Sequence, residues 1–218
     1  RVAHGGARGS AGSTPPGTNP PTVLDAYALD IPAVSTLHIQ QPGLYFVACP
    51  TTSGWAGAVV YESVDNVAYS IAGTLQTPHV MGAATNVLAV GSTLTMDVTN
   101  TVNVRMSNGA TLASATIDEV GIGANWFLLG DEILAFLTAT LETDGSYTLS
   151  NLLRGLRDTS DHMATHAVDE RFVRLTALGE NAIWWPFPDG LAANGRRRYI
   201  KIVPAGALLA DITAIDFT

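Results

Sequence analysis

Charged side chains are scarce in this chain of 218 residues. Asp, Glu, Lys and Arg together make up 14% of it, whereas an ordinary soluble domain has roughly 25%. Hydrophobic residues make up 47%, but no run reaches the ~18 consecutive apolar residues that suggest a membrane-spanning helix. A chain of this composition can fill a sizeable core and leaves much of its surface uncharged. We therefore expect part of that surface to be covered in an assembly.

Basic side chains are the scarcer of the two charged kinds. The chain has 11 Lys and Arg against 19 Asp and Glu, which gives a net charge of −8. This balance argues against binding to nucleic acid, because such binding needs a basic surface that meets the phosphates. The only basic cluster, Arg196-Arg197-Arg198, precedes a strand-like run, and we expect it to be solvated.

Cysteine is nearly absent. Cys49 is the only one, so no internal disulfide can form. It ends the apolar run Leu44–Cys49, and we expect it to be a buried small hydrophobic residue rather than a nucleophile.

Motifs of common enzymes are missing as well. No Gly-x-Ser-x-Gly elbow occurs, and the glycines at 121 and 123 lack the Gly-Lys-Ser/Thr of a phosphate-binding loop. We therefore expect no catalytic residue, no cofactor and no enzyme activity in this segment.

Two histidines have the spacing of a zinc helix. His162 and His166 stand four residues apart, but Met163 occupies the position where the metalloprotease motif has Glu. The preceding residues 157–160 are typical of a loop. We expect both histidines to lie in a surface loop that binds no metal.

Two pairs of acids could in principle act as general acid and base. They are Asp118-Glu119 and Asp131-Glu132. Each pair begins a predicted element, where acids favour a helix start or lie at a solvated strand end. Neighbours on a strand also point to opposite faces, so neither pair need share a site.

Aromatic residues gather in Trp184-Trp185-Pro186-Phe187-Pro188. Such a cluster can form a platform for sugars. The other interpretation, which we favour, is an apolar contact at a domain or subunit interface, where Trp and Phe are enriched.

The remaining signals predict a mostly β fold of short-stranded sandwich or barrel-like modules with one or two short helices at most. Residues 1–21 are rich in Gly and Pro and predict a linker or extended arm. We expect one β module at 22–91 and a second, β-rich module at 92–218. The chain begins at Arg1 without Met, and we expect it to be part of a longer protein. Strands are predicted near 44–49, 57–63, 67–72, 94–98, 102–107, 110–116, 133–141, 147–153, 171–175 and 198–203.

Turn residues indicate two hairpins in the second module. Asn108-Gly109 predicts a tight hairpin between 102–107 and 110–116. Asp144-Gly145 predicts another, whose second strand ends in Leu152-Leu153-Arg154-Gly155. Between the two hairpins, Thr116 and the acids after it predict a helix of one or two turns.

The second hairpin lies within a longer pattern. It consists of Gly130 to Ile133, Tyr147 to Gly155, His166, and Arg171 to Leu175. This pattern resembles the C-terminal part of tail-tip (baseplate) hub proteins of long-tailed phages and gene transfer agents. Arg157-Asp158-Thr159 departs from that family, which more often has Gly before Thr.

The resemblance implies a structural function. Three hub copies would close the distal end of the tail tube in the virion and join distal-tail proteins, other tail-tip proteins and receptor-binding fibres, meeting the host surface only indirectly. Two alternatives stay open: a carbohydrate- or cell-surface-binding module that uses Trp184 to Phe187, and a cell-wall hydrolase that uses one acid pair. For the structural function we expect Arg154 to be held by a carboxylate or by carbonyls, and Arg154→Ala to destabilise by ~1–3 kcal/mol.

Overall fold

A computed structural model describes residues 24–217 except 37, 53, 176–182 and 191–194. The expected linker at 1–21 lies outside the described residues. The chain is mostly β, as predicted. No helix in the described part is long and apolar enough to cross a membrane.

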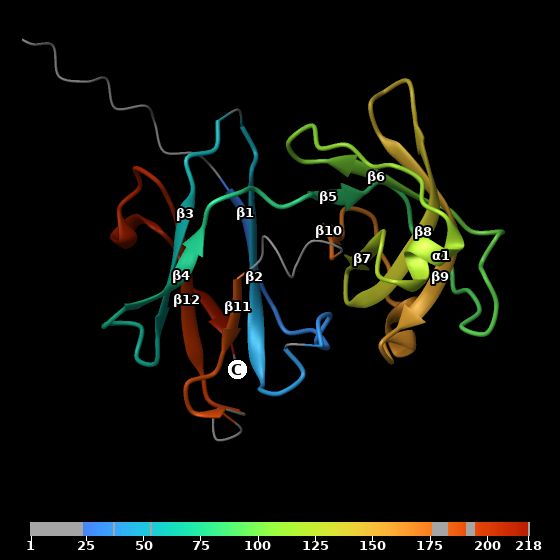
Figure 1. Cartoon of the computed structure of the whole chain (residues 1–218). Coiled ribbons are helices and arrows are strands. Elements are labelled where there is room, and N and C mark those ends of the chain that lie inside the picture. The colour runs from blue at the N-terminus through green and yellow to red at the C-terminus, as the bar shows by residue number, and fades with distance from the viewer. Residues whose placement is uncertain (1–23, 37, 53, 176–182, 191–194, 218) are drawn as a thin grey trace, which may run out of the picture.

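The strands fall into three antiparallel groups (Figure 1). The inner sheet has the order β1-β2-β11, with β1 at Leu24–Leu29, β2 at Gly43–Pro50 and β11 at Ile183–Pro186. The outer sheet has the order β13-β12-β3-β4, with β13 at Ile215–Phe217, β12 at Arg198–Pro204, β3 at Ala58–Ser63 and β4 at Ser70–Leu75.

The third group is a closed barrel of order β10-β5-β6-β9-β8-β7. Its strands are β5 (Met81–Ala84), β6 (Val102–Met106), β7 (Trp126–Leu129), β8 (Glu132–Leu141), β9 (Tyr147–Leu156) and β10 (Arg171–Arg174). Closure leaves no free edge. The helix α1 (Ile117–Gly121) and the 3-10 helices η1 (Ser160–Ala164) and η3 (Leu209–Asp211) complete the described elements.

Strand β2 explains how the three groups pack together. Successive side chains of a strand point to opposite faces. Leu44, Phe46 and Ala48 pack against the outer sheet, whereas Tyr45, Val47 and Cys49 pack against residues of the barrel. A strand buried on both faces needs a continuous apolar run, and this is why Leu44–Cys49 does not alternate with polar residues. Cys49 is fully buried, as predicted.

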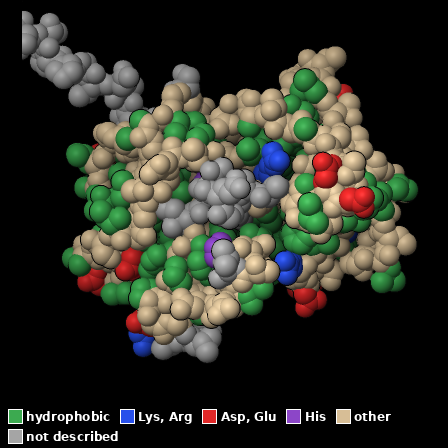
Figure 2. All heavy atoms as spheres, viewed as in Figure 1, with side chains coloured by type: hydrophobic (Ala, Val, Ile, Leu, Met, Phe, Trp, Pro, Cys, Tyr) green, Lys and Arg blue, Asp and Glu red, His purple; other side chains and the backbone are tan. Residues whose placement is uncertain are grey.

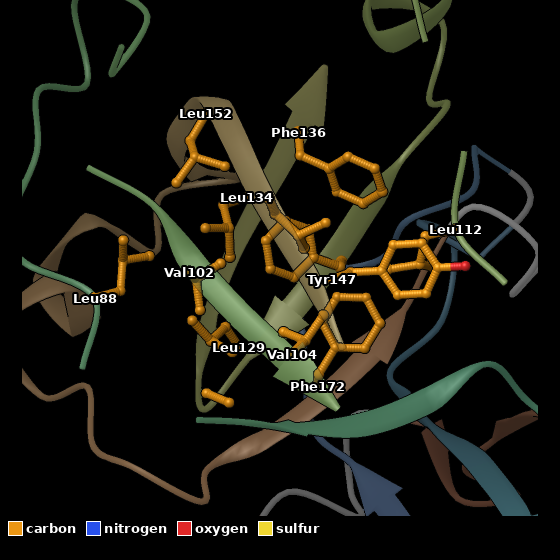
Figure 3. Packing of buried hydrophobic residues seen from close by; sticks show 13 residues of the cluster. Leu88, Val102, Val104, Leu112, Leu129, Leu134, Phe136, Tyr147, Leu152 and Phe172 are labelled. Carbon is orange, nitrogen blue, oxygen red and sulfur yellow. The ribbon is translucent and has the colours of Figure 1, made fainter. Parts of the chain in front are cut away.

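The barrel has a core of its own (Figure 3). Phe127, Phe136 and Phe172 come from three different strands, and Phe127 lies with its ring centroid 5.7 Å from that of Phe136 and 5.0 Å from that of Phe172. Tyr147 and Leu152 reach the same interior from β9. The barrel is therefore filled with side chains.

The expected division between residues 91 and 92 does not follow the strand pairing. Strand β5 lies in the barrel, although it precedes residue 92. Strand β11 pairs with β2, and β12 pairs with β3, so both ends of the described chain build the two-sheet sandwich around the barrel segment. Hydrophobic alternation gives a strand its faces but does not identify its partner.

Local turn signals were correct for one hairpin and wrong for the other. Strands β8 and β9 pair across Asp144-Gly145, as predicted. At Asn108-Gly109, however, the expected partner strand at 110–116 is absent from the described structure, and β6 pairs with β5 and β9 instead. The separate strand expected at 94–98 is also absent there. The strand expected at 67–72 begins at Ser70. The short helix and its Thr116 N-cap are confirmed, and Glu119 completes a capping box.

Candidate functional site

Five ionisable side chains from distant parts of the chain meet beside the barrel core. Glu132 begins β8 and Arg154 lies near the end of β9. Asp97 comes from the long β5–β6 connection, while His166 and Glu170 lie between η1 and β10. We call these five residues the ion cluster.

Glu132 is the centre of the ion cluster. It lies on the same face of β8 as Leu134 and Phe136, which are core residues of the barrel, so its carboxylate points inward. Its Oε1 accepts hydrogen bonds from Arg154 Nε (2.9 Å) and from the Gly155 backbone N–H (2.7 Å). Its Oε2 accepts one from Arg154 Nη2 (2.8 Å). The side chain of Glu132 is 0% exposed, so these partners replace water.

Arg154 donates hydrogen bonds to three different groups. Besides its fork on Glu132, its Nη1 donates to the carbonyl of Ala89 (2.9 Å) and to Asp97 Oδ2 (3.2 Å). Its side chain is 0% exposed. The prediction that a carboxylate or carbonyls hold Arg154 is confirmed. Gly155 adopts a φ of +61°, and a Cβ there would lie 3.0 Å from Ser160 Cα, so glycine permits the sharp exit from β9.

His166 lies between two carboxylates. Its Nε2 is 2.6 Å from Glu132 Oε2 and its Nδ1 is 2.8 Å from Glu170 Oε1. Both ring nitrogens must therefore donate, and the ring is an imidazolium cation. Burial alone lowers the pKa of His166, but the hydrogen bonds to Glu132 and Glu170 outweigh it and raise the pKa to about 9. Burial raises the pKa of Glu132, yet the bonds from His166 and Arg154 leave it below its usual value.

The three central members of the ion cluster are closed to solvent. The side chains of Glu132, Arg154 and His166 are 0%, 0% and 2% exposed. A catalytic acid or base must reach its substrate directly or through one water, and these groups have no such access. What the cluster can do is join β8, β9 and the β5–β6 connection to the segment before β10.

A pH dependence of stability follows from His166. Because its folded pKa of about 9 exceeds the usual ~6.5, its contribution is complete below ~6.5 and is lost as pH rises through about 9. We expect the free energy of unfolding in urea to fall across this window. His166→Gln should remove the fall, while His162→Gln, at an exposed position, should keep it. An unchanged pH slope in His166→Gln would contradict this assignment.

Neither histidine meets the surface-loop expectation in full, since His162 is partly exposed but lies in the 3-10 helix η1. His162 is 40% exposed and lies 3.6 Å from Asp161. His166 is buried in the ion cluster, so the surface-loop expectation was wrong for it. The two rings do not share a site.

We predict that the purified chain binds no zinc. Within the described residues, no group of three His, Cys, Asp or Glu could hold a metal ion. Elemental analysis should find far less than one zinc per chain. One zinc per chain that disappears in His162→Ala would overturn this prediction.

The two acid pairs have separate surroundings. Glu119 caps α1 through Thr116. Asp131 is 65% exposed and pairs with Arg171, whereas its neighbour Glu132 is buried. The expectation of solvated acids at the strand end was therefore wrong for Glu132. The sequence did contain an indication of this burial, because Glu132, Leu134 and Phe136 alternate along β8 and therefore share one face.

The basic cluster is also divided. Arg196 and Arg197 are 62% and 60% exposed, but the side chain of Arg198 is 3% exposed and pairs with Glu62 and Asp189. Its guanidinium lies over the rings of Trp185 and Phe187, at 5.2 and 5.5 Å from their centroids. The expectation of a solvated cluster was wrong for Arg198, because strand alternation turns it inward.

The aromatic cluster is divided by the inner sheet. Trp185 is 8% exposed and belongs to the core between the two sheets. Trp184 packs on the opposite face and stacks on His38, with ring centroids 4.8 Å apart. A groove of about 820 Å³ lies beside Trp184, lined also by His38, Gln40 and Gln41. The two indoles therefore form no shared platform.

Burial raises the pKa of the Cys49 thiol to about 11, which makes it a poor nucleophile.

Comparison with known proteins points to the barrel. A family model described as Rcc01698-like, C-terminal, matches residues 79–173. The match covers less than half of the chain, begins just before β5 and ends within β10. It includes all five members of the ion cluster. A search of curated proteins found no match.

Proposed function

We propose that this chain is a structural module of a phage or phage-like tail tip, a part of the hub protein that closes the distal tail tube. In this proposal three copies surround the tail axis, contact distal-tail and other tail-tip proteins, and anchor receptor-binding parts. The segment itself carries out no catalysis and binds no cofactor. The virion, at the distal end of its tail, is the expected location.

One observation carries the proposal. The pattern that resembles hub proteins comprises four separate stretches, at Gly130–Ile133, Tyr147–Gly155, His166 and Arg171–Leu175. In the folded chain these stretches supply strands of one barrel and three members of one sealed ion cluster, namely Glu132, Arg154 and His166. The three charged side chains are buried and bonded to one another, so these stretches contribute to the stability of the barrel, which supports a structural function.

The surface gives a second argument. Among the described residues on the face shown in Figure 2, charged side chains are sparse, and most of the visible atoms belong to hydrophobic side chains, other uncharged side chains or the backbone. Uncharged groups can be buried between subunits without the cost of removing ions from water. A chain with a net charge of −8 and so little charge overall suits an assembled state.

The direct test is a reconstruction of the intact particle. The proposal expects this barrel and sandwich at the distal tail tip in three equivalent copies, each burying at least ~1,000 Å² against its neighbours. Density for the chain at the capsid, or at the tip with a symmetry other than threefold, would contradict the proposal.

A further inference from the structure

The connection between β5 and β6 is a compact projection. Residues 85–101, which we call the finger, extend from the side of the barrel that faces away from the sandwich (Figure 1). The stem is closed by a hydrogen bond from Thr85 N–H to the Asn103 carbonyl (2.7 Å) and by one from the Asn86 side chain to the Thr101 carbonyl (3.1 Å). Irregular connections of this length in compact domains commonly have a function.

Buried groups fix the finger in place. Leu88 is 1% exposed and fills part of the barrel core. Asp97 exchanges two backbone hydrogen bonds with Leu152 on β9, and its carboxylate accepts from the Asn100 N–H (3.0 Å). Arg154 bonds the carbonyl of Ala89 and the Asp97 carboxylate. The ion cluster therefore holds the finger in one shape.

The finger nevertheless exposes large aliphatic side chains. Leu94, near the middle of the finger in sequence, is 92% exposed. On the stem, Val87, Val90 and Val98 are 55%, 62% and 69% exposed. The Asn100 side chain bonds the Val90 carbonyl, which brings the two halves of the stem together. Several large apolar side chains exposed on one anchored projection indicate an interaction surface.

The finger also lacks ionised groups on its outside. Asp97 is the only Asp, Glu, Lys or Arg in residues 85–101, and its side chain is 5% exposed. Two different proteins commonly recognise each other through complementary charges, and the finger offers no exposed charged side chain. Contacts between identical subunits have the more apolar interfaces. Copies that each carry a charge of −8 repel one another least where neither presents an ion.

We propose that the finger is a self-association surface, where it packs against the finger of a second copy of this chain around a shared symmetry axis. Leu94 lies at the centre of this contact, with Val90 and Val98 beside it. This contact rests on the proposed tail-tip function only for the number of copies, which is three. The contact itself follows from the exposure and neutrality of the finger.

Sedimentation equilibrium of the purified chain tests this contact without the particle. The wild type should self-associate at concentrations up to about 1 mM. Leu94→Asp should weaken association at least ~10-fold, because it places like charges in an apolar contact. The matched control is Val67→Asp, at an 82% exposed position of the β3–β4 connection, which should associate like the wild type. Circular dichroism checks that each variant is folded.

A cysteine variant tests whether finger meets finger. Cys49 is buried, so Leu94→Cys provides the one accessible thiol among the described residues. With oxidised glutathione it should give a disulfide-linked dimer, whereas Val67→Cys should not. A monomeric wild type, association unchanged in Leu94→Asp, or an unlinked Leu94→Cys would each overturn the proposal. The tail-tip function would survive any of these results, since it depends on where the particle holds the chain.

Discussion

Arg154→Ala should destabilise the chain by ~3–5 kcal/mol, the range for breaking a buried ion pair on one side. The truncation removes two hydrogen bonds from Glu132 and leaves the Ala89 carbonyl and one side of Asp97 without a donor. This exceeds the ~1–3 kcal/mol expected from the sequence, because three groups, namely Glu132, the Ala89 carbonyl and Asp97, depend on one buried guanidinium. Unfolding in urea gives the measurement.

Two variants provide controls for Arg154. Arg197→Ala breaks an exposed pair with Asp216 and should change stability little, because solvent screens such pairs. Arg154→Lys keeps the charge but cannot reproduce the planar fork, so it should lose most of the stabilisation. Hydrogen exchange should speed up in residues 85–101 of Arg154→Ala, since the finger loses its anchor. Equal losses in Arg154→Ala and Arg197→Ala would contradict the cluster as described.

Glu132→Gln should be comparably damaging although it barely changes shape. The amide leaves the Arg154 and His166 cations facing a neutral group in a site without water, and it can accept fewer charge-assisted bonds than the four that Glu132 receives. We expect a loss of ~3–5 kcal/mol near neutral pH. The stability fall between pH ~6.5 and about 9 should also shrink, because the pKa of His166 returns toward its usual value.

The adjacent acid is the matched control for Glu132. Asp131→Asn changes the same charge one residue earlier, at a 65% exposed side chain. It should alter the free energy of unfolding by no more than ~0.5 kcal/mol. A Glu132→Gln protein as stable as Asp131→Asn would show that the buried ion cluster contributes nothing to the fold.

Local signals in the sequence predicted the local structure well. The Asp144-Gly145 hairpin and the capping box at Thr116 depend on residues within a few positions of one another, and both are confirmed. The apolar run Leu44–Cys49 likewise predicted burial. These features need no knowledge of distant partners.

Features that depend on distant partners were not predictable in the same way. Alternation at 94–98 suggested a strand, but the carboxylate of Asp97 is bound by Arg154 and the segment folds into the finger instead. The carboxylate partners of Arg154 lie 22 and 57 positions away in the sequence. His166 was expected at the surface, since nothing near it indicates that Glu132 lies opposite. The one local indication of burial was that Glu132 lies two residues before Leu134, on the same inward face of the strand.

The ring nitrogens of His166 provide the most direct test of a sealed, structural ion cluster. Nitrogen-15 NMR of the folded chain at about pH 8, where an ordinary histidine is neutral, should show both nitrogens protonated. Their protons should exchange slowly with water, because the side chain is 2% exposed between Glu132 and Glu170. A neutral His166 ring at that pH, with protons that exchange rapidly, would contradict the account and indicate a solvent-accessible site.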